Sequence, residues 1–212
     1  MKHLFLTSSI YTVAKDIAEK CNLAAQKNKK CACIVTPVEP DGLDQTWLRR
    51  DLDALKDAGF ETFDYTITDK NEAQLRADLA DTAFIYVSGG NTYYMLEKAQ
   101  QSGFISVIQE YILKGEKTYI STSAGSIVAG PDTSPALRLD KLEDAPNLDG
   151  YKGFELVNFC LLPHWGSNTF RDLYLHTRLE HAYKKGQVPL ILLTDTQYIW
   201  VEGDRHQIFD VA

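Results

Sequence analysis

Apolar residues along this chain alternate between two kinds of pattern. Short continuous apolar runs, typical of buried strands, alternate with longer stretches in which apolar residues recur every three or four positions, as helices require. The predicted strands are His3–Ser8, Cys31–Thr36, Thr62–Thr68, Ala83–Val87, Thr118–Ile120, the apolar run Phe154–Leu162, and Leu190–Leu193. The predicted helices are a segment with Val13, Ile17, Ala18, Cys21 and Ala24-Ala25 on one face, then Leu43–Ala58, Asn71–Asp81, two helices ending at Gly103 and Gly115, and Phe170–Lys185 capped by Gly186.

Strands that alternate with helices predict an α/β protein with a mostly parallel sheet covered on both faces. Tyr198–Val201 and Gln207–Val211 flank Gly203-Asp204 and predict a closing hairpin. With 212 residues and no repeat or linker, the chain is expected to form a single catalytic domain over residues 1–212. Such folds place their chemistry in the loops at the carboxyl ends of the strands.

Composition narrows the classes of function. The chain carries 22 Lys+Arg and 29 Asp+Glu, a net charge of −7, which argues against partners that present phosphate, whether nucleic acid or a membrane surface. No apolar run approaches the roughly 20 residues of a membrane span, and the apolar start is too short for a signal peptide, so a cytoplasmic protein is expected. The four cysteines, of which Cys31 and Cys33 share one strand face, are expected to be reduced and mostly buried.

The segment Ser121-Thr122-Ser123-Ala124-Gly125 follows a predicted strand. It is similar to a nucleophile elbow, G-x-S-x-G, in which small residues let the chain turn sharply and expose the serine. Here Ser121 stands in place of the first glycine. A Ser/Gly-rich turn that caps a helix is the alternative interpretation.

A serine nucleophile needs a base. Among the five histidines, His164 differs because it follows an apolar strand and lies between Pro163 and Trp165. It is therefore the candidate base for Ser123.

Acyl transfer also needs donors for the oxyanion and a carboxylate to hold the histidine. Gly90, from the turn Gly89-Gly90-Asn91, and Ala124 are expected to supply backbone N–H groups, and Asn91 is expected to contact substrate. Asp195 ends a predicted strand and is preferred as the carboxylate. Asp144, in an irregular stretch, is the competing candidate.

These motifs, Val87-Ser-Gly-Gly-Asn-Thr92, Ser123-Ala-Gly125 and Pro163-His164, in this order and spacing, resemble the dipeptidase E family of serine peptidases, which includes aspartyl dipeptidases. The resemblance implies a three-layer fold related to class I glutamine amidotransferases, with Ser123 as nucleophile, His164 as base and Gly90 as an oxyanion donor. Asp195 and Asp144 each match an aspartate position that the family offers for the triad. No metal or cofactor is implied.

The resemblance further implies hydrolysis of short peptides, with Asp-X dipeptides as candidate substrates. An arginine suits an aspartate pocket because its planar fork binds a carboxylate in two places. Arg171, close to the His164 loop, is the candidate, whereas Arg178 is expected to be solvated. A related amidase for isopeptide or non-peptide bonds, and a catalytically silent binding protein, stay open, as does assembly into a homo-oligomer.

Overall fold

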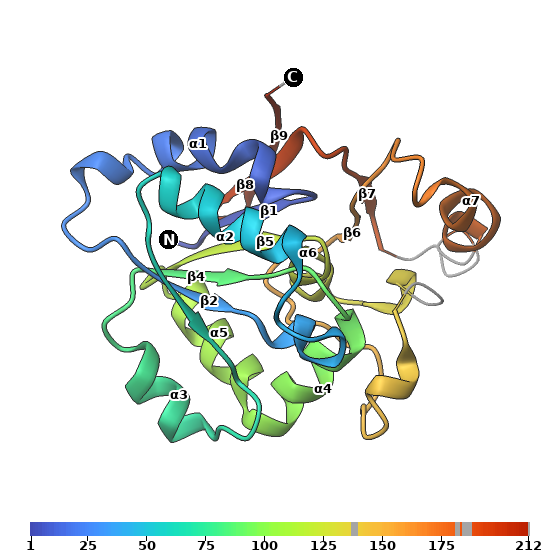
Figure 1. Cartoon of the computed structure of the whole chain (residues 1–212), viewed down its shortest axis with the longest axis horizontal. Coiled ribbons are helices and arrows are strands. Elements are labelled where there is room, and N and C mark those ends of the chain that lie inside the picture. Colours follow the sequence, from blue (N-terminus) through green and yellow to red (C-terminus); the bar gives the residue numbers. More distant parts are fainter. Residues whose placement is uncertain (137–139, 181–182, 184–187, 212) are drawn as a thin grey trace.

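A seven-stranded sheet forms the centre of the molecule, in a computed structural model that describes residues 1–136, 140–180, 183 and 188–211 (Figure 1). Its strands are β1 (His3–Thr7), β2 (Lys30–Ile34), β3 (Glu61–Tyr65), β4 (Phe84–Val87), β5 (Thr118–Thr122), β8 (Gln197–Glu202) and β9 (Arg205–Asp210). The order is β3-β2-β4-β5-β1-β8-β9, in which the first five are parallel and β8 and β9 form the antiparallel closing hairpin. The mostly parallel sheet and the hairpin are confirmed.

Helices cover both faces of this sheet, which gives three layers (Figure 1). On one face, α1 (Ile10–Lys20) and α2 (Thr46–Asp57) pack on Phe5, Cys31, Cys33 and Tyr86. On the other, α3 (Glu72–Leu79), α4 (Thr92–Ser102) and α5 (Phe104–Leu113) pack on the opposite side chains of the same strands. The two buried cysteines lie on one strand face, as predicted. Among the described residues, no helix has the length and apolar character needed to cross a membrane.

Two predicted strands lie outside the central sheet. β6 (Cys160–Leu162) pairs in parallel with β7 (Leu190–Leu192) to form a separate two-stranded sheet. Figure 1 shows this pair beside the central sheet, toward α7 (Arg171–Leu173). The prediction of a buried strand at 190–193 is wrong for β7, whose three residues are half-buried, whereas Leu193 is buried.

Several shorter elements differ from the predicted ones. The first helix stops at Lys20, because Asn22 adopts a left-handed conformation and a 3₁₀ turn, η1 (Leu23–Ala25), follows. The predicted helix at 170–185 is described only in part: α7 continues into a π-helix, η5 (Tyr174–Arg178), and residues 181–182 and 184–187 lie outside the described residues. The remaining 3₁₀ turns are η2 (Thr36–Asp41), η3 (Ser134–Ala136) and η4 (Leu142–Asp144).

Candidate active site

Ser123 occupies a sharp turn between β5 and α6 (Ala124–Val128). Its backbone has φ +48° and ψ −108°, a conformation that L-residues avoid and that occurs at functional turns. A Cβ on Gly125 would lie 2.3 Å from the carbonyl oxygen of Val87, so only glycine lets α6 begin this close to β4. The segment therefore has the backbone geometry of a nucleophile elbow.

Ser121, which stands where the elbow pattern has its first glycine, is fully buried in the sheet. Its hydroxyl lies 2.8 Å from that of Ser126, which in turn donates a hydrogen bond of 2.7 Å to the Thr7 carbonyl. These contacts tie the end of β5 to the first turn of α6 and to β1. A hydroxyl at position 121 thus braces the elbow.

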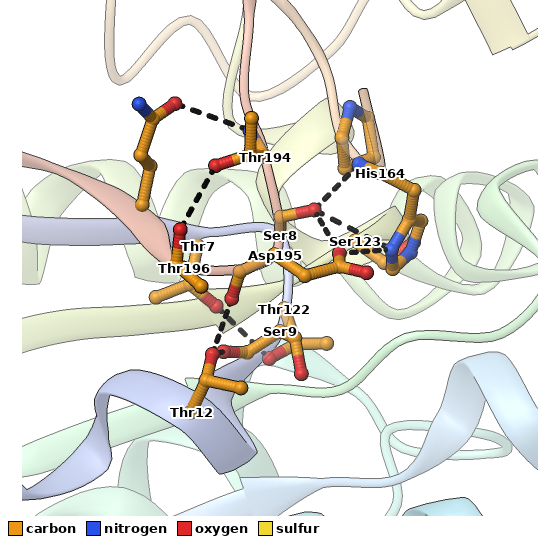
Figure 2. A network of polar contacts seen from close by, with 12 residues as sticks. Thr7, Ser8, Ser9, Thr12, Thr122, Ser123, His164, Thr194, Asp195 and Thr196 are labelled. Atoms are coloured by element: carbon orange, nitrogen blue, oxygen red, sulfur yellow. Dashed lines mark hydrogen bonds and ion pairs between the residues drawn. The ribbon is translucent and has the colours of Figure 1, made fainter. Parts of the chain in front are cut away.

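The His164 ring lies between Ser123 and Asp195 (Figure 2). Its Nε2 is 3.0 Å from Ser123 Oγ, and its Nδ1 is 2.6 Å from Asp195 Oδ1. The ring also stacks on Phe170, with centroids 4.9 Å apart and planes 18° apart. With the Nδ1–H directed at Asp195, Nε2 is free to accept the serine proton, so the three side chains have the geometry of a serine hydrolase triad.

The small β6–β7 sheet positions both His164 and Asp195. Leu162 and Leu192 are paired in register, and each strand runs directly into a loop that carries one of the two side chains. The Trp165 N–H donates to the Leu193 carbonyl at 2.9 Å, which holds the two loops together. The pKa of Asp195 is lowered, chiefly by its hydrogen bond with His164, so this carboxylate is ionised at neutral pH.

Ser8 belongs to the same hydrogen-bonded network and was not singled out from the sequence. Its buried hydroxyl donates to Asp195 Oδ1 at 2.8 Å and accepts the backbone N–H of His164 (Figure 2). Ser8 directly follows β1, which pairs in parallel with β5, the strand that precedes Ser123. This position at a strand end is the signal in the sequence that could have identified Ser8.

Asp144 and Asn91 contact each other instead of the His164 ring. Asn91 Nδ2 donates to Asp144 Oδ2 at 3.1 Å and to the Lys141 carbonyl at 2.8 Å, while its Oδ1 accepts two backbone N–H groups at the start of α4. The structure thus places Asp195, not Asp144, on His164. Asn91 caps α4, and its side-chain amide is hydrogen-bonded within the protein, so its contact with substrate stays a prediction.

Gly90 lines the cavity beside Ser123, and Ala124 directly follows Ser123 as the first residue of α6. Gly90 has φ +125°, and a Cβ there would lie 2.3 Å from the Pro37 carbonyl oxygen, so this turn requires glycine. Neither the Gly90 nor the Ala124 N–H donates to another described residue of the protein. Both are therefore available to a bound group.

A cavity of about 310 Å³ opens beside Ser123 and His164. Besides those two residues, its walls are formed by Ser8, Ser9, Trp47, Arg50, Asp51, Gly89, Gly90, Thr92, Thr122, Ile127, Asp140, Pro163, Phe170, Tyr174 and Arg178. We call it the Ser123 pocket. Arg171 does not line it; this side chain lines a neighbouring cavity with Trp165 and Leu175.

The buried arginine in the wall of the Ser123 pocket is Arg178, and the expectation that it is solvated is wrong. Its side chain is 1% exposed, stacks on the Tyr174 ring and donates from Nη1 to the Tyr174 hydroxyl at 2.6 Å. Its Nε and Nη2 have no partner among the described residues. The signal in the sequence is the spacing of Phe170, Tyr174 and Arg178, four apart, which puts all three on one helical face.

Two acidic side chains, Asp51 and Asp140, line the Ser123 pocket. Burial raises the pKa of Asp51 to about 7, against the opposing charges of Arg50 and His164. Burial also raises the pKa of Asp140, which accepts the Thr92 N–H at 2.9 Å. Across the described part of the chain, no cluster of three or more His, Cys, Asp and Glu side chains could hold a metal ion.

Comparisons with known proteins point to one family. Residues 10–209 match the family model described as peptidase family S51. The uncharacterized peptidase Lmo0363 of Listeria monocytogenes is 30% identical over 204 residues, which are 96% of both chains. Peptidase E of Shewanella oneidensis is 27% identical over 135 residues, 61% of this chain and 54% of that protein.

Solved structures agree with these matches. The crystal structure of a Listeria monocytogenes protein assigned to peptidase E superimposes with a TM-score of 0.86 over the whole of both chains, at 25% identity. A peptidase from an acI-B1 Actinobacterium shares the fold with a TM-score of 0.71, covering all of this chain and 88% of the other, at 18% identity. The resemblance to the dipeptidase E family and the three-layer fold are confirmed.

Proposed function

Since this chain belongs to peptidase family S51, we propose that it hydrolyses short peptides through a serine acyl-enzyme intermediate. The observation that carries the proposal is a continuous chain of hydrogen bonds through the His164 ring. Ser123 Oγ lies 3.0 Å from its Nε2, and Asp195 Oδ1 lies 2.6 Å from its Nδ1. Folding alone does not explain why a serine with a strained backbone should be hydrogen-bonded to a histidine. Nucleophilic catalysis explains both the strain and the contact.

In this mechanism, Ser123 Oγ attacks the peptide carbonyl as its proton moves to His164 Nε2. Asp195 holds the ring in the required tautomer and stabilises the imidazolium. The Gly90 and Ala124 N–H groups stabilise the oxyanion. The C–N bond then breaks as His164 returns the proton to the leaving amine, and a water molecule, activated by the same ring, hydrolyses the acyl-enzyme.

For the substrate, we propose a peptide with a carboxylate on the residue whose carbonyl is attacked, as in Asp-X dipeptides. Arg178 supports this assignment because its unpartnered Nε and Nη2 lie in the wall of the pocket that contains Ser123. A buried guanidinium with two free donors has the fork geometry that binds a carboxylate in two places. Arg171, the candidate from the sequence, lines a different cavity.

Hydrolysis of Asp-Leu, Ala-Leu and the isopeptide β-aspartyl-leucine by the wild type and by Ser123→Ala tests the proposal. We expect the wild type to prefer Asp-Leu and Ser123→Ala to be inactive. A preference for the isopeptide would favour the amidase alternative. Binding of Asp-Leu without turnover would favour the silent binding protein.

Arg178→Met tests the substrate assignment separately. We expect it to raise KM for Asp-Leu on the order of 10- to 100-fold more than for Ala-Leu, the size of a lost charged hydrogen-bonding pair. Arg178→Lys should restore only part of the preference, because an ammonium lacks the fork. Arg171→Met is the matched control and should leave the preference unchanged; equal losses on both dipeptides in Arg178→Met would contradict the assignment.

A further inference from the structure

Unpartnered buried polar atoms gather at the Ser123 pocket. Among the described residues, buried side-chain nitrogen or oxygen atoms without a hydrogen-bond partner belong to Asp51, Thr62, Tyr86, Thr92 and Arg178. Three of these, Asp51, Thr92 and Arg178, line the pocket. Buried polar groups in folded proteins are almost always hydrogen-bonded. These atoms are therefore placed to meet polar groups of a bound molecule.

Asp51 is the acidic member of this set. It lies on the buried stripe of α2 together with Leu48, Leu52 and Leu55, and the residue is only 3% exposed. Its Oδ1 is buried without a partner. An aspartate at an apolar helix position destabilises the fold, since a carboxylate loses its hydration there. The backbone N–H of Tyr11, in the first turn of α1, donates to this carboxylate and offsets part of the cost.

Its surroundings in the protein offer only partial compensation. The neighbouring Arg50 is exposed, and its guanidinium lies 4.5 Å from the centroid of the Tyr11 ring. Burial, with a smaller contribution from the charge of Asp195, opposes the ionised carboxylate. The charges of Arg50 and His164 and the hydrogen bond from the Tyr11 N–H favour it. Tyr86 is close enough for Asp51 to raise its pKa, together with burial, which is the larger cause. A cation delivered by a ligand would complete the site.

We propose that Asp51 binds the α-ammonium group of the substrate and so makes the enzyme select peptides with a free N-terminus. The proposal rests on the proposed peptidase function. An ammonium has three donors and no acceptor, and an ionised carboxylate only accepts, so the two groups are complementary. An N-terminal aspartate would then place its ammonium at Asp51 and its side-chain carboxylate at Arg178, two opposite charges on the walls of one pocket.

The raised pKa of Asp51 agrees with binding of an ammonium group at this side chain. With a pKa of about 7, the carboxyl group of the empty pocket is partly protonated at neutral pH. A bound ammonium would favour the carboxylate, as any opposite charge within a few Å does. Binding of a peptide with a free α-amino group should therefore displace a proton from Asp51.

Two pairs of substrates isolate the amino group. Asp-Leu and succinyl-Leu differ only in the α-amino group, and so do Ala-Leu and propionyl-Leu. For the wild type, we expect kcat/KM to favour the amino member of each pair on the order of 10- to 100-fold, the range for hydrogen bonds to charged groups. Asp51→Asn should remove most of that preference in both pairs, mainly through KM, and Asp51→Glu should keep part of it.

Asp53→Asn is the matched control, because Asp53 lies on the same helix, is exposed and pairs with Lys56 at 3.8 Å. It should keep the wild-type preference. If Asp51→Asn also keeps it, or lowers turnover of all four substrates by one common factor, the proposal is overturned and Asp51 has a structural role.

Binding measured in the Ser123→Ala background separates this proposal from the proposed function. Titration calorimetry should show tighter binding of Asp-Leu than of succinyl-Leu, and the added Asp51→Asn change should remove the difference. If the wild type hydrolyses none of the four compounds but this difference in binding is seen, the peptidase function fails and the role of Asp51 stands. Equal affinities for both compounds in Ser123→Ala would overturn the role of Asp51.

Discussion

At the scale of single residues, the proposed mechanism makes Ser123 and His164 one catalytic unit. Their 3.0 Å contact links the nucleophile to the only base within reach among the described residues. Replacing either by Ala should lower kcat on the order of 10⁴-fold with a smaller change in KM. The double variant should lose no more than either single one, because the two side chains act in the same step. Steady-state assays with the best dipeptide check this expectation, and a Ser123→Ala enzyme with near-normal turnover would overturn the assignment.

The carboxylate of the unit can be tested by comparing two aspartates. Asp195→Asn should cost far more activity than Asp144→Asn, because Asp195 accepts from the His164 ring at 2.6 Å and Asp144 accepts from the helix cap Asn91. Comparing kcat of the two variants under the same conditions shows which substitution costs more activity. A larger loss in Asp144→Asn would show that the pair in the structure is not the functional one.

Ser8 is a positioning residue in this unit. Its hydroxyl holds both Asp195 and the backbone of His164, so Ser8→Ala should lower kcat on the order of tenfold, by loosening the carboxylate without removing it. The pH profile distinguishes this role from a purely structural one. Loss of the Ser8 hydrogen bond should raise the pKa of Asp195, because that bond helps to lower it. If Ser8 positions Asp195 and His164, the acidic limb of the kcat/KM profile of Ser8→Ala should move. If its role is only structural, Tm should change and the pH profile should stay the same.

At the scale of elements, the elbow depends on how closely α6 approaches β4. Gly125→Ala would bring a Cβ to within 2.3 Å of the Val87 carbonyl and should destabilise the fold by about 1–3 kcal/mol while displacing Ser123. Gly89→Ala is the matched control, since its Cβ would make only ordinary contacts, at 3.5 Å from Ser123 Cβ. Thermal melts of both variants check this. Equal Tm values for Gly125→Ala and the wild type would contradict the expected packing.

Apolar periodicity predicted those elements whose buried face follows from the spacing of apolar residues within the element itself. Strands β1, β2, β4 and β5 and the helices α1 and α2 follow from apolar spacing, because each buries one stripe or one run against the same sheet. The polar helix α3 and the mostly exposed strand β3 do not show such a stripe or run. The separate β6–β7 sheet could not be predicted in this way. Apolar runs at 154–162 and 190–193 indicate strands, but which strands pair is decided by contacts between distant segments.

Within the site, the sequence predicted the residues that lie in turns at strand ends. It missed the residues whose place in the site depends on how helices pack. Ser123, His164 and Asp195 each end a strand, and that position made them candidates. Arg178 and Asp51 lie inside helices, where an ionisable residue is usually solvated. Their function is visible only in the combination of burial with unpartnered atoms, which requires coordinates. In retrospect, an aspartate inside the apolar stripe of α2 was a signal in the sequence.

At the scale of the whole molecule, the buried Asp51 links substrate selection to stability. Its pKa is about 7 in the folded chain and should be close to the ordinary 3.8 when the chain is unfolded. Between these values the folded chain holds a proton that the unfolded chain has released. Stability from this group is therefore full below about pH 4, falls as the pH rises, and is lost above about pH 7.

Asp51→Asn, which stays neutral at every pH, should be more stable than the wild type at pH 8 and should lose that advantage near pH 4. The difference at pH 8 should be on the order of a few kcal/mol, since each unit of pKa shift corresponds to about 1.4 kcal/mol. Tm measured across this range checks the prediction, with Asp53→Asn as the control for a general change of charge on α2. An advantage of equal size at both pH values would mean that Asp51 does not titrate as its burial requires. A stability gain at pH 8, combined with loss of the preference for peptides that carry a free α-amino group, would identify Asp51 as a residue kept for function at the expense of the fold.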